Sequence, residues 1–299
     1  MYSVSKAVVG AYVGLSLLGW FLRAYNIASH FSTAHSEPTL LVLVTTETPK
    51  WAFWTVVTSP FVELEVIPFL LGVGVLGAGG RYCEKIWSGR KYLVFVGICL
   101  LPNLALDLVC AFVSLANGRE YRINGMSCLV AGIAVALKQL VSENVIVLFN
   151  GRFRLKIRWL PSFLLVSIPI LDFVGLHENT LAFLLGFVTA WVYLRFYQQL
   201  PQVSGRTRLL SRPLIRGDAS DAFSFAKFFP DRLSPLIGKL TDPIYSIAVK
   251  LRIIPIFTEQ QIQSANQRYA TRLAGGVLPF YSTSQTTSER RRAVLESLD

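Results

Sequence analysis

The 299-residue sequence is poor in charged side chains. Only 16% of its residues are Asp, Glu, Lys or Arg, whereas 53% are hydrophobic and the mean hydropathy is +0.48. Ordinary soluble domains carry about a quarter charged residues, and so apolar a soluble chain would expose large hydrophobic patches. The shortage of charge therefore excludes an ordinary soluble domain and favours a membrane protein.

Cysteine and histidine are also scarce, with four and three residues. The cysteines lie in or beside apolar segments at spacings that match no metal-binding knuckle, so we expect buried small hydrophobes, no metal site and no cofactor. No Asn-x-Ser/Thr sequon occurs. The formal net charge of +11 comes from basic residues that flank apolar runs, which indicates topology determinants and headgroup contacts and argues against nucleic acid binding.

The stretch Ile123–Gln139 (INGMSCLVAGIAVALKQ) is predicted to be a central membrane helix. Its small residues recur every four positions on one face, and small residues let helices approach closely in lipid. Its one reactive-looking side chain is Ser127. The residues expected to permit close helix packing, here and in other spans, are Gly72, Gly80, Gly125, Cys128, Gly132, Ala136, Gly186 and Ala190.

Five further apolar runs, with their flanks, approach the roughly 20 residues that a helical span requires. Asp107 should face the bundle interior, and Lys138 should extend to the headgroups. Basic residues concentrate in an expected elbow at Gly80–Lys91, in the loop after the fourth span and in the tail, which predicts cytosolic termini. The runs are Val8–Leu22, Leu64–Gly79, Tyr92–Leu115, Leu160–Val174 and Thr180–Tyr197.

Shorter segments are predicted at the membrane surface. Leu40–Val44 is too short to span, and Trp51–Pro60 is aromatic and ends on a proline. Glu143–Trp159 alternates apolar and basic residues, which is typical of a strand pair, here with a turn at Asn150–Gly151.

Composition divides the chain into three parts. Residues 1–198 are predicted to form the transmembrane domain. Residues 199–254 form a basic, amphipathic, membrane-associated segment, in which Pro230, Pro235 and Pro243 should separate short helices lying on the cytosolic leaflet. Residues 255–299 form a polar tail that ends in a short amphipathic helix at Ser288–Leu298.

Six spans, with a glycine-rich second span and a serine at the start of the fourth, resemble the rhomboid superfamily. The turn motif Gly80-Arg81-x-x-Glu84, followed by Trp87 and Gly89, looks like the rhomboid turn after the second span, and Trp54-Thr55 with Thr58 looks like the entry of the first loop. The sequence most resembles the eukaryotic rhomboid-like transmembrane protein 115 family. Its specific segments are Val135–Gln139, Trp191–Gln198, Phe223–Pro230 and Glu289–Arg292.

This resemblance implies an all-α membrane protein: a six-helix rhomboid-like transmembrane bundle with a C-terminal cytosolic tail that contains short interfacial helices. It implies a multi-pass Golgi protein with both termini cytosolic, acting as a non-catalytic scaffold or adaptor in vesicle-mediated transport from the Golgi to the ER. The expected partners are the lipid bilayer, transmembrane helices of cargo proteins, a cytosolic vesicle-tethering complex bound through the tail, and a second copy of the chain.

The resemblance also implies a pseudoprotease. An intramembrane serine protease needs a base beside its serine and donors for the oxyanion. Rhomboid proteases supply Gly-x-Ser-Gly on the fourth span, a histidine on the sixth and His-x-x-x-Asn on the second. Here Gly125-Met126-Ser127-Cys128 keeps the serine, but Phe183 replaces the base and Pro68 and Gly72 replace the span-two pair.

Two other function classes stay open. An active protease would use Ser127 with another base, but His177 precedes Phe183 by about 9 Å of helix axis, and Lys138 lies roughly 16 Å from the serine. The other histidines, His30 and His35, fall in the first loop. A small-solute transporter would need a polar path at mid-membrane, for which Asp107 is a single candidate group.

Overall fold

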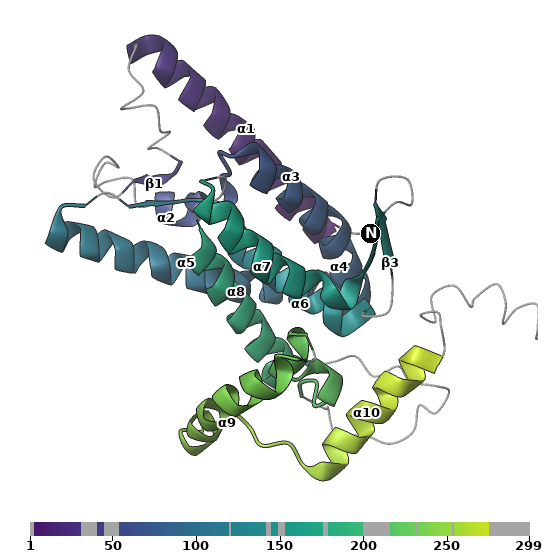
Figure 1. The fold of residues 1–299 in the computed structure, drawn as a ribbon. Helices are drawn as coiled ribbons and strands as arrows, with labels where there is room; N and C mark the ends of the chain where they lie inside the picture. Colours follow the sequence, from purple (N-terminus) through teal and green to yellow (C-terminus); the bar gives the residue numbers. More distant parts are fainter. Residues whose placement is uncertain are drawn as a thin grey trace, which may run out of the picture. The chain divides into compact units, whose positions relative to one another are not determined.

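The structure is a computed structural model, and it is dominated by helices (Figure 1). It divides into two compact units, Met1–Gly217 and Asp218–Asp299. The residues that it describes are 3–30, 41–44, 54–119, 121–141, 145–148, 153–175, 179–199, 216–230, 232–252 and 254–274.

Every run predicted to be a span coincides with helix in the first unit. Four helical segments are long and apolar enough to cross a membrane: Ser3–Tyr25, Val66–Trp87, Gly89–Asn117 and Thr180–Tyr197. The two shorter predicted spans are α6 and α7. The helices are α1 (Ser3–His30), α3 (Val66–Gly74), α4 (Arg81–Trp87), α5 (Gly89–Asn117), α6 (Ser127–Val141), α7 (Leu160–Phe173) and α8 (Thr180–Val192).

The expected elbow at Gly80–Lys91 contains a turn, but the turn comes near its end, because Arg81–Trp87 is helical. A π-helical turn, Val75–Gly80, joins α3 to α4, so the second span continues to Trp87. The chain turns instead at Ser88, which has φ 77° and directly precedes α5. A glycine-rich stretch can remain helical in a bundle because glycine there admits close neighbours, and the charges after it extend the same helix.

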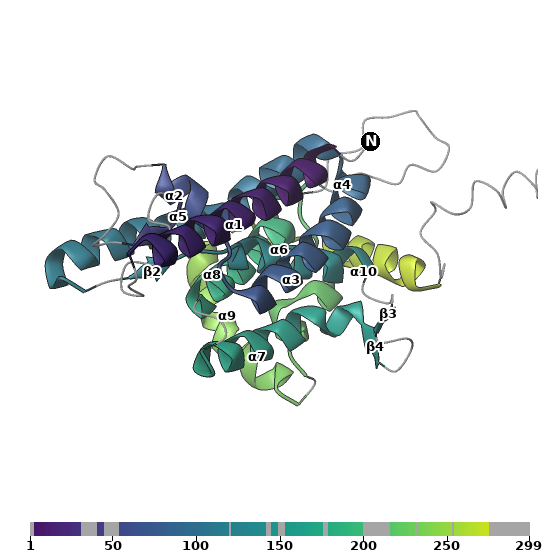
Figure 2. The same cartoon turned by 90° about the horizontal axis from the view of Figure 1, so that it is seen from above.

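Helix α6 is the centre of the first unit, and Figures 1 and 2 show it enclosed by its neighbours. All 15 of its residues are buried, and it packs against α5, α7, α8 and the π-helical turn. Its predicted start was too early, because the chain before Ser127 is not helical. The prediction that Lys138 reaches the headgroups is also wrong, since that side chain is only 7% exposed.

Two short antiparallel strand pairs connect the helices. β1 (Leu43–Val44) pairs with β2 (Arg122–Ile123), which ties the apolar patch of the first loop to the segment before α6. β3 (Val145–Leu148) pairs with β4 (Phe153–Lys156), which confirms the predicted strand pair. The expected turn at Asn150–Gly151 lies outside the described residues. The segment before the second span holds a short helix α2 (Thr55–Thr58) and a 3-10 turn at Ser59–Phe61.

The second unit contains 3-10 turns at Asp221–Phe223 and Phe225–Phe228 and two helices, α9 (Ser234–Lys250) and α10 (Glu259–Ala274). The prediction that Pro230, Pro235 and Pro243 separate short helices holds only in part. Pro230 lies between the second 3-10 turn and α9, whereas Pro235 lies in the first turn of α9 and Pro243 lies inside the helix. Pro243 is exposed, so water can hydrate the carbonyl four residues earlier that loses its donor. The predicted helix at Ser288–Leu298 lies outside the described residues.

Helix α10 was not predicted, although its start carries a capping box. The Gln261 amide N–H donates to Thr258 Oγ1 at 3.4 Å, and the Thr258 N–H donates to Gln261 Oε1 at 3.0 Å. Asn266 exchanges two hydrogen bonds with Asp221, which holds α10 against the first 3-10 turn of this unit.

Candidate functional site

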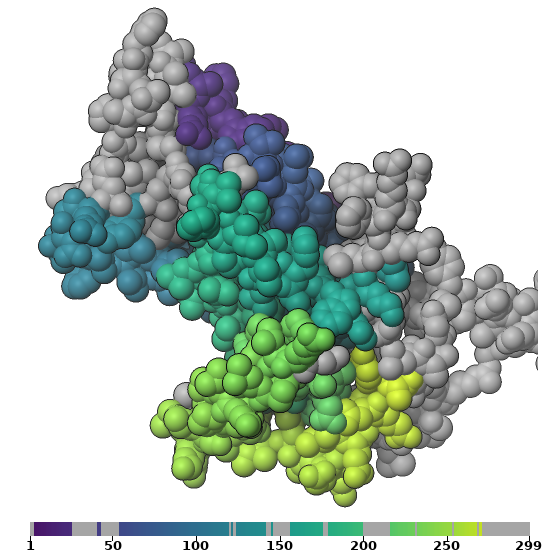
Figure 3. All heavy atoms as spheres, viewed as in Figure 1, coloured from purple at the N-terminus to yellow at the C-terminus, as the bar shows by residue number. Residues whose placement is uncertain are grey.

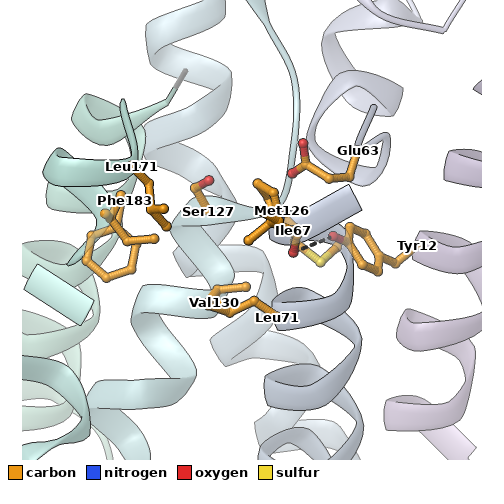
Figure 4. Close-up of a pocket in the computed structure, with 11 residues that line it drawn as sticks. Tyr12, Glu63, Ile67, Leu71, Met126, Ser127, Val130, Leu171 and Phe183 are labelled. Atoms are coloured by element: carbon orange, nitrogen blue, oxygen red, sulfur yellow. Dashed lines mark hydrogen bonds between the residues drawn. The ribbon is translucent and has the colours of Figure 1, made fainter. Parts of the chain in front are cut away.

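A pocket in the first unit brings together the residues at the positions of a rhomboid active site (Figure 4). Ser127 is the first residue of α6, Phe183 comes from the first turn of α8, and Pro68 comes from α3. Gly72 lies one turn beyond Pro68, where an added Cβ would meet the Tyr12 hydroxyl. The lining residues are Tyr12, Glu63, Ile67, Pro68, Leu71, Met126, Ser127, Val130, Ile168, Leu171 and Phe183.

The described wall of the pocket is mostly apolar. No histidine, lysine or arginine is among its lining residues in the described part of the chain. Phe183 is fully buried, and its ring can accept no proton from a serine hydroxyl. Pro68 has no amide N–H and no side-chain donor, and Gly72 has no side chain, so neither residue offers the side-chain donors that His and Asn have at these positions in a rhomboid protease. The structure describes no side chain for His30 and no part of His35 or His177.

One acidic residue in the pocket was missed by the sequence reasoning. Glu63 is 3% exposed, and its carboxylate lies where a Cβ on Gly125 would be. Figure 4 shows Glu63 on the opposite side of Met126 from Ser127. Its place in the sequence, an acid directly before the apolar run of the second span, was the available signal.

Hydrogen bonds fix the backbone that leads into Ser127. The Gly125 N–H donates to the Ser59 carbonyl at 3.0 Å, and the Asn179 side-chain amide donates to the Asn124 carbonyl at 2.5 Å. Gly125 has φ +92°, a conformation that favours glycine. The prediction that Gly125 is a helix-packing residue is therefore corrected: it forms a tight turn before the helix.

Asp107 faces the bundle interior, as predicted. It is fully buried, and Ser59 Oγ donates to its Oδ2 at 2.9 Å. One turn earlier on α5, the buried Asn103 lies beside Cys128, whose thiol donates to the Ala182 carbonyl at 2.9 Å. These polar contacts join α5, α6 and α8. Among the described residues, no group of three or more His, Cys, Asp or Glu side chains is arranged to hold a metal ion.

Helix α6 lies very close to its neighbours at two of the small residues. A Cβ on Gly186 would overlap the backbone of Cys128. A Cβ on Gly132 would lie 2.6 Å from the Cys99 sulfur and 3.4 Å from Ala190 Cβ. Gly80 faces the Tyr92 hydroxyl, and Ala136 is fully buried.

Comparison with known proteins agrees with this architecture. Residues 6–298 match the family described as eukaryotic integral membrane protein (DUF1751). The chain belongs to this family. No solved structure matches it.

Several curated proteins are similar to this member of the family. It is 26% identical to transmembrane protein 115 of Homo sapiens over 262 residues, which covers 84% of this chain and 68% of that protein. It is 28% identical to rhomboid-like protein 19 of Arabidopsis thaliana over 265 residues, covering 84% and 77%. It is 25% identical to the transmembrane protein 115 homolog of Saccharomyces cerevisiae over 262 residues, covering 81% and 74%. The chain is thus a rhomboid-like membrane protein, and the resemblance found in its sequence is confirmed.

The turn motif of this family member closes the end of the bundle where α1 begins. Glu84 Oε1 accepts the Val4 N–H at 3.2 Å, and Oε2 accepts the Ser5 N–H at 2.8 Å. The first amide groups of a helix have no partner within the helix, so this carboxylate caps α1. Trp87 is buried and packs edge-on against Phe95 of α5 at 5.1 Å between ring centroids. Arg81 is exposed.

The segment Trp191–Gln198 also has a structural explanation. It ends the sixth span with a π-helical turn, Tyr193–Tyr197. Directly after this turn, the Gln198 carbonyl accepts the Gly217 N–H at 2.7 Å. A Cβ on Gly217 would overlap the Arg195 carbonyl. The chain therefore returns to the end of this span before the second unit begins.

Proposed function

We propose that this rhomboid-like protein is a non-catalytic scaffold in Golgi-to-ER vesicle transport. The observation that carries the proposal is Phe183, buried in the same pocket as Ser127 where a protease would present its base. With an aromatic ring there and Pro68 opposite, the pocket is suited to helix packing and not to acyl transfer.

The scaffold has two working parts in this proposal. The bundle of the first unit retains or recognises transmembrane helices of cargo proteins, because its outer surface is apolar and its core is held by close contacts. The second unit, which includes the polar tail, recruits a cytosolic vesicle-tethering complex. The Golgi location, the cytosolic termini and association with a second copy of the chain belong to the same proposal and rest on the family resemblance.

The two parts can be separated in cells that lack the endogenous protein. We expect Ser127→Ala to restore retrieval of Golgi cargo to the ER as well as the wild type does. Removal of residues 218–299, which leaves the first unit intact, should abolish retrieval while the protein still inserts into the membrane. Loss of retrieval in Ser127→Ala at normal protein levels would contradict the scaffold proposal.

A further inference from the structure

Helix α9 carries a continuous apolar stripe that the described part of the second unit leaves uncovered. Its residues are spaced by three or four positions and therefore share one helix face. The stripe is more than half exposed along most of its length, with Leu236 at 59%, Leu240 at 63% and Ile244 at 66%. The atoms of α9 are coloured green to yellow-green in Figure 3. The members of the stripe are Leu233, Leu236, Leu240, Ile244, Ile247 and Leu251.

The flank of α9 beside the stripe is held within its own unit. The helix packs against the 3-10 turn Phe225–Phe228, and Ile237 and Ala248 on that flank are partly covered. The exposed stripe therefore belongs to a helix that is packed against the rest of its unit. It is a fixed surface that large aliphatic side chains present to the surroundings, and such surfaces mark sites of interaction.

A row of basic residues borders the stripe. Arg232, Lys239 and Lys250 are separated by seven and eleven residues, close to two and three helical turns, so they align along one edge. Asp242 is the one acidic residue of the helix, and its position places it on the polar face, away from the stripe. Aliphatic side chains with lysines along their margin are typical of helices that lie in a membrane interface.

The composition of the stripe favours lipid over a protein partner. It consists of leucine and isoleucine alone, whereas binding hot spots between proteins are enriched in tryptophan, tyrosine and arginine. Tyr245, the one aromatic residue of α9, lies on the face opposite Leu236.

The bilayer is also within reach of this helix. Gly217 is hydrogen-bonded beside the end of the sixth span, and Leu233 follows it by 16 residues. A chain of that length extends at most roughly 55 Å. A connection of this length is short enough for α9 to reach the surface of the membrane that holds its own bundle.

We propose that α9 is a binding surface for an anionic bilayer, with its apolar stripe in the acyl boundary and Arg232, Lys239 and Lys250 at the headgroups. The helix would anchor the second unit to the membrane that holds the first. This inference goes beyond the scaffold proposal, because an anchored second unit would serve a protease or a transporter equally well.

The test uses the full-length protein in nanodiscs of phosphatidylcholine alone or with phosphatidylserine, and it measures hydrogen exchange in peptides that cover 234–250. We expect slower exchange in the anionic discs. Each basic residue near an anionic surface strengthens binding by about fivefold, so Lys239→Gln with Lys250→Gln should weaken docking about thirtyfold. Exchange in this variant should then resemble that in neutral discs.

The stripe is tested separately by a matched pair of double variants. Leu240→Gln with Ile244→Gln should remove the slowing of hydrogen exchange in anionic discs. Tyr245→Gln with Ser246→Gln, on the other faces of the same helix, should retain it. Equal exchange in neutral and anionic discs would overturn the proposal. Protection that rises with the number of copies per disc would also overturn it, because it would assign the stripe to a second copy of the chain.

Discussion

At the scale of the residue, buried carboxylates organise the first unit. Asp107 and Glu84 are both almost fully buried, and each accepts hydrogen bonds from a segment distant in the sequence. A buried carboxylate is costly unless it is hydrogen-bonded, and removing it leaves its donors unpaired. These residues therefore specify which helices meet.

Glu84 provides the sharpest prediction at this scale. Glu84→Ala leaves the Val4 and Ser5 amide groups without their acceptors and should cost about 1–3 kcal/mol of stability. Glu84→Gln keeps one acceptor oxygen and should cost less. The apparent melting temperature in detergent, followed by tryptophan fluorescence, measures the effect.

The control for this prediction is Arg81→Ala, three residues earlier on the same helix and exposed. Its melting temperature should stay close to that of the wild type. If Arg81→Ala and Glu84→Ala lowered the melting temperature equally, the capping role of Glu84 would be wrong.

At the scale of the element, close backbone contacts set where the helices cross. Gly186→Ala places a methyl group against the Cys128 backbone, which cannot move away as a flexible side chain could. Overpacking of this kind costs roughly 1–3 kcal/mol. The same melting experiment should therefore show a lower midpoint.

The matched control is Gly97→Ala on α5, where an added Cβ meets nothing within 4 Å. Alanine is the better helix former by up to about 1 kcal/mol, so this variant should be neutral or stabilising. Equal destabilisation by both substitutions would show that glycine flexibility, and not the α6–α8 contact, is what matters.

The contact between Gly217 and the end of the sixth span gives a second prediction at the scale of the element. Gly217→Ala should strain a backbone at φ 75° and also overlap the Arg195 carbonyl, whereas Gly118→Ala, at φ 65°, meets nothing within 4 Å. Hydrogen exchange of the backbone amide of residue 217 should accelerate strongly in the first variant. An accelerated Gly217 amide in Gly118→Ala as well would contradict this local explanation.

At the scale of the whole molecule, hydropathy alone predicted all six helical runs of the bundle. The spacing of small residues also predicted that Gly186 and Cys128 are close-packing positions, although not that they meet each other. What could not be predicted depends on pairing over long distances: Glu84 meets residues 79 and 80 positions away, and Glu63 enters the pocket of a serine 64 positions later. Periodicity reports which face of a helix is buried and says nothing of which distant group will meet it.

Local signals failed for a different reason in two places. The charged residues that follow the glycines indicated an elbow from Gly80 onward, but bundle packing kept that stretch helical until Ser88. Pro243 indicated a helix break, but an exposed helix with a strong apolar stripe tolerated it. In both cases tertiary packing or the surroundings of the helix outweighed a residue preference of about 1–3 kcal/mol.

The central claim is that the pocket at Ser127 does not support serine catalysis. The most direct measurement is labelling of the purified protein in liposomes with a fluorophosphonate probe, comparing the wild type with Ser127→Ala and using an active rhomboid protease as the positive control. We expect the protease to be labelled and the two forms of this protein to show the same background. Labelling of the wild type that disappears in Ser127→Ala would contradict the account, and Glu63 would then be the first base to replace.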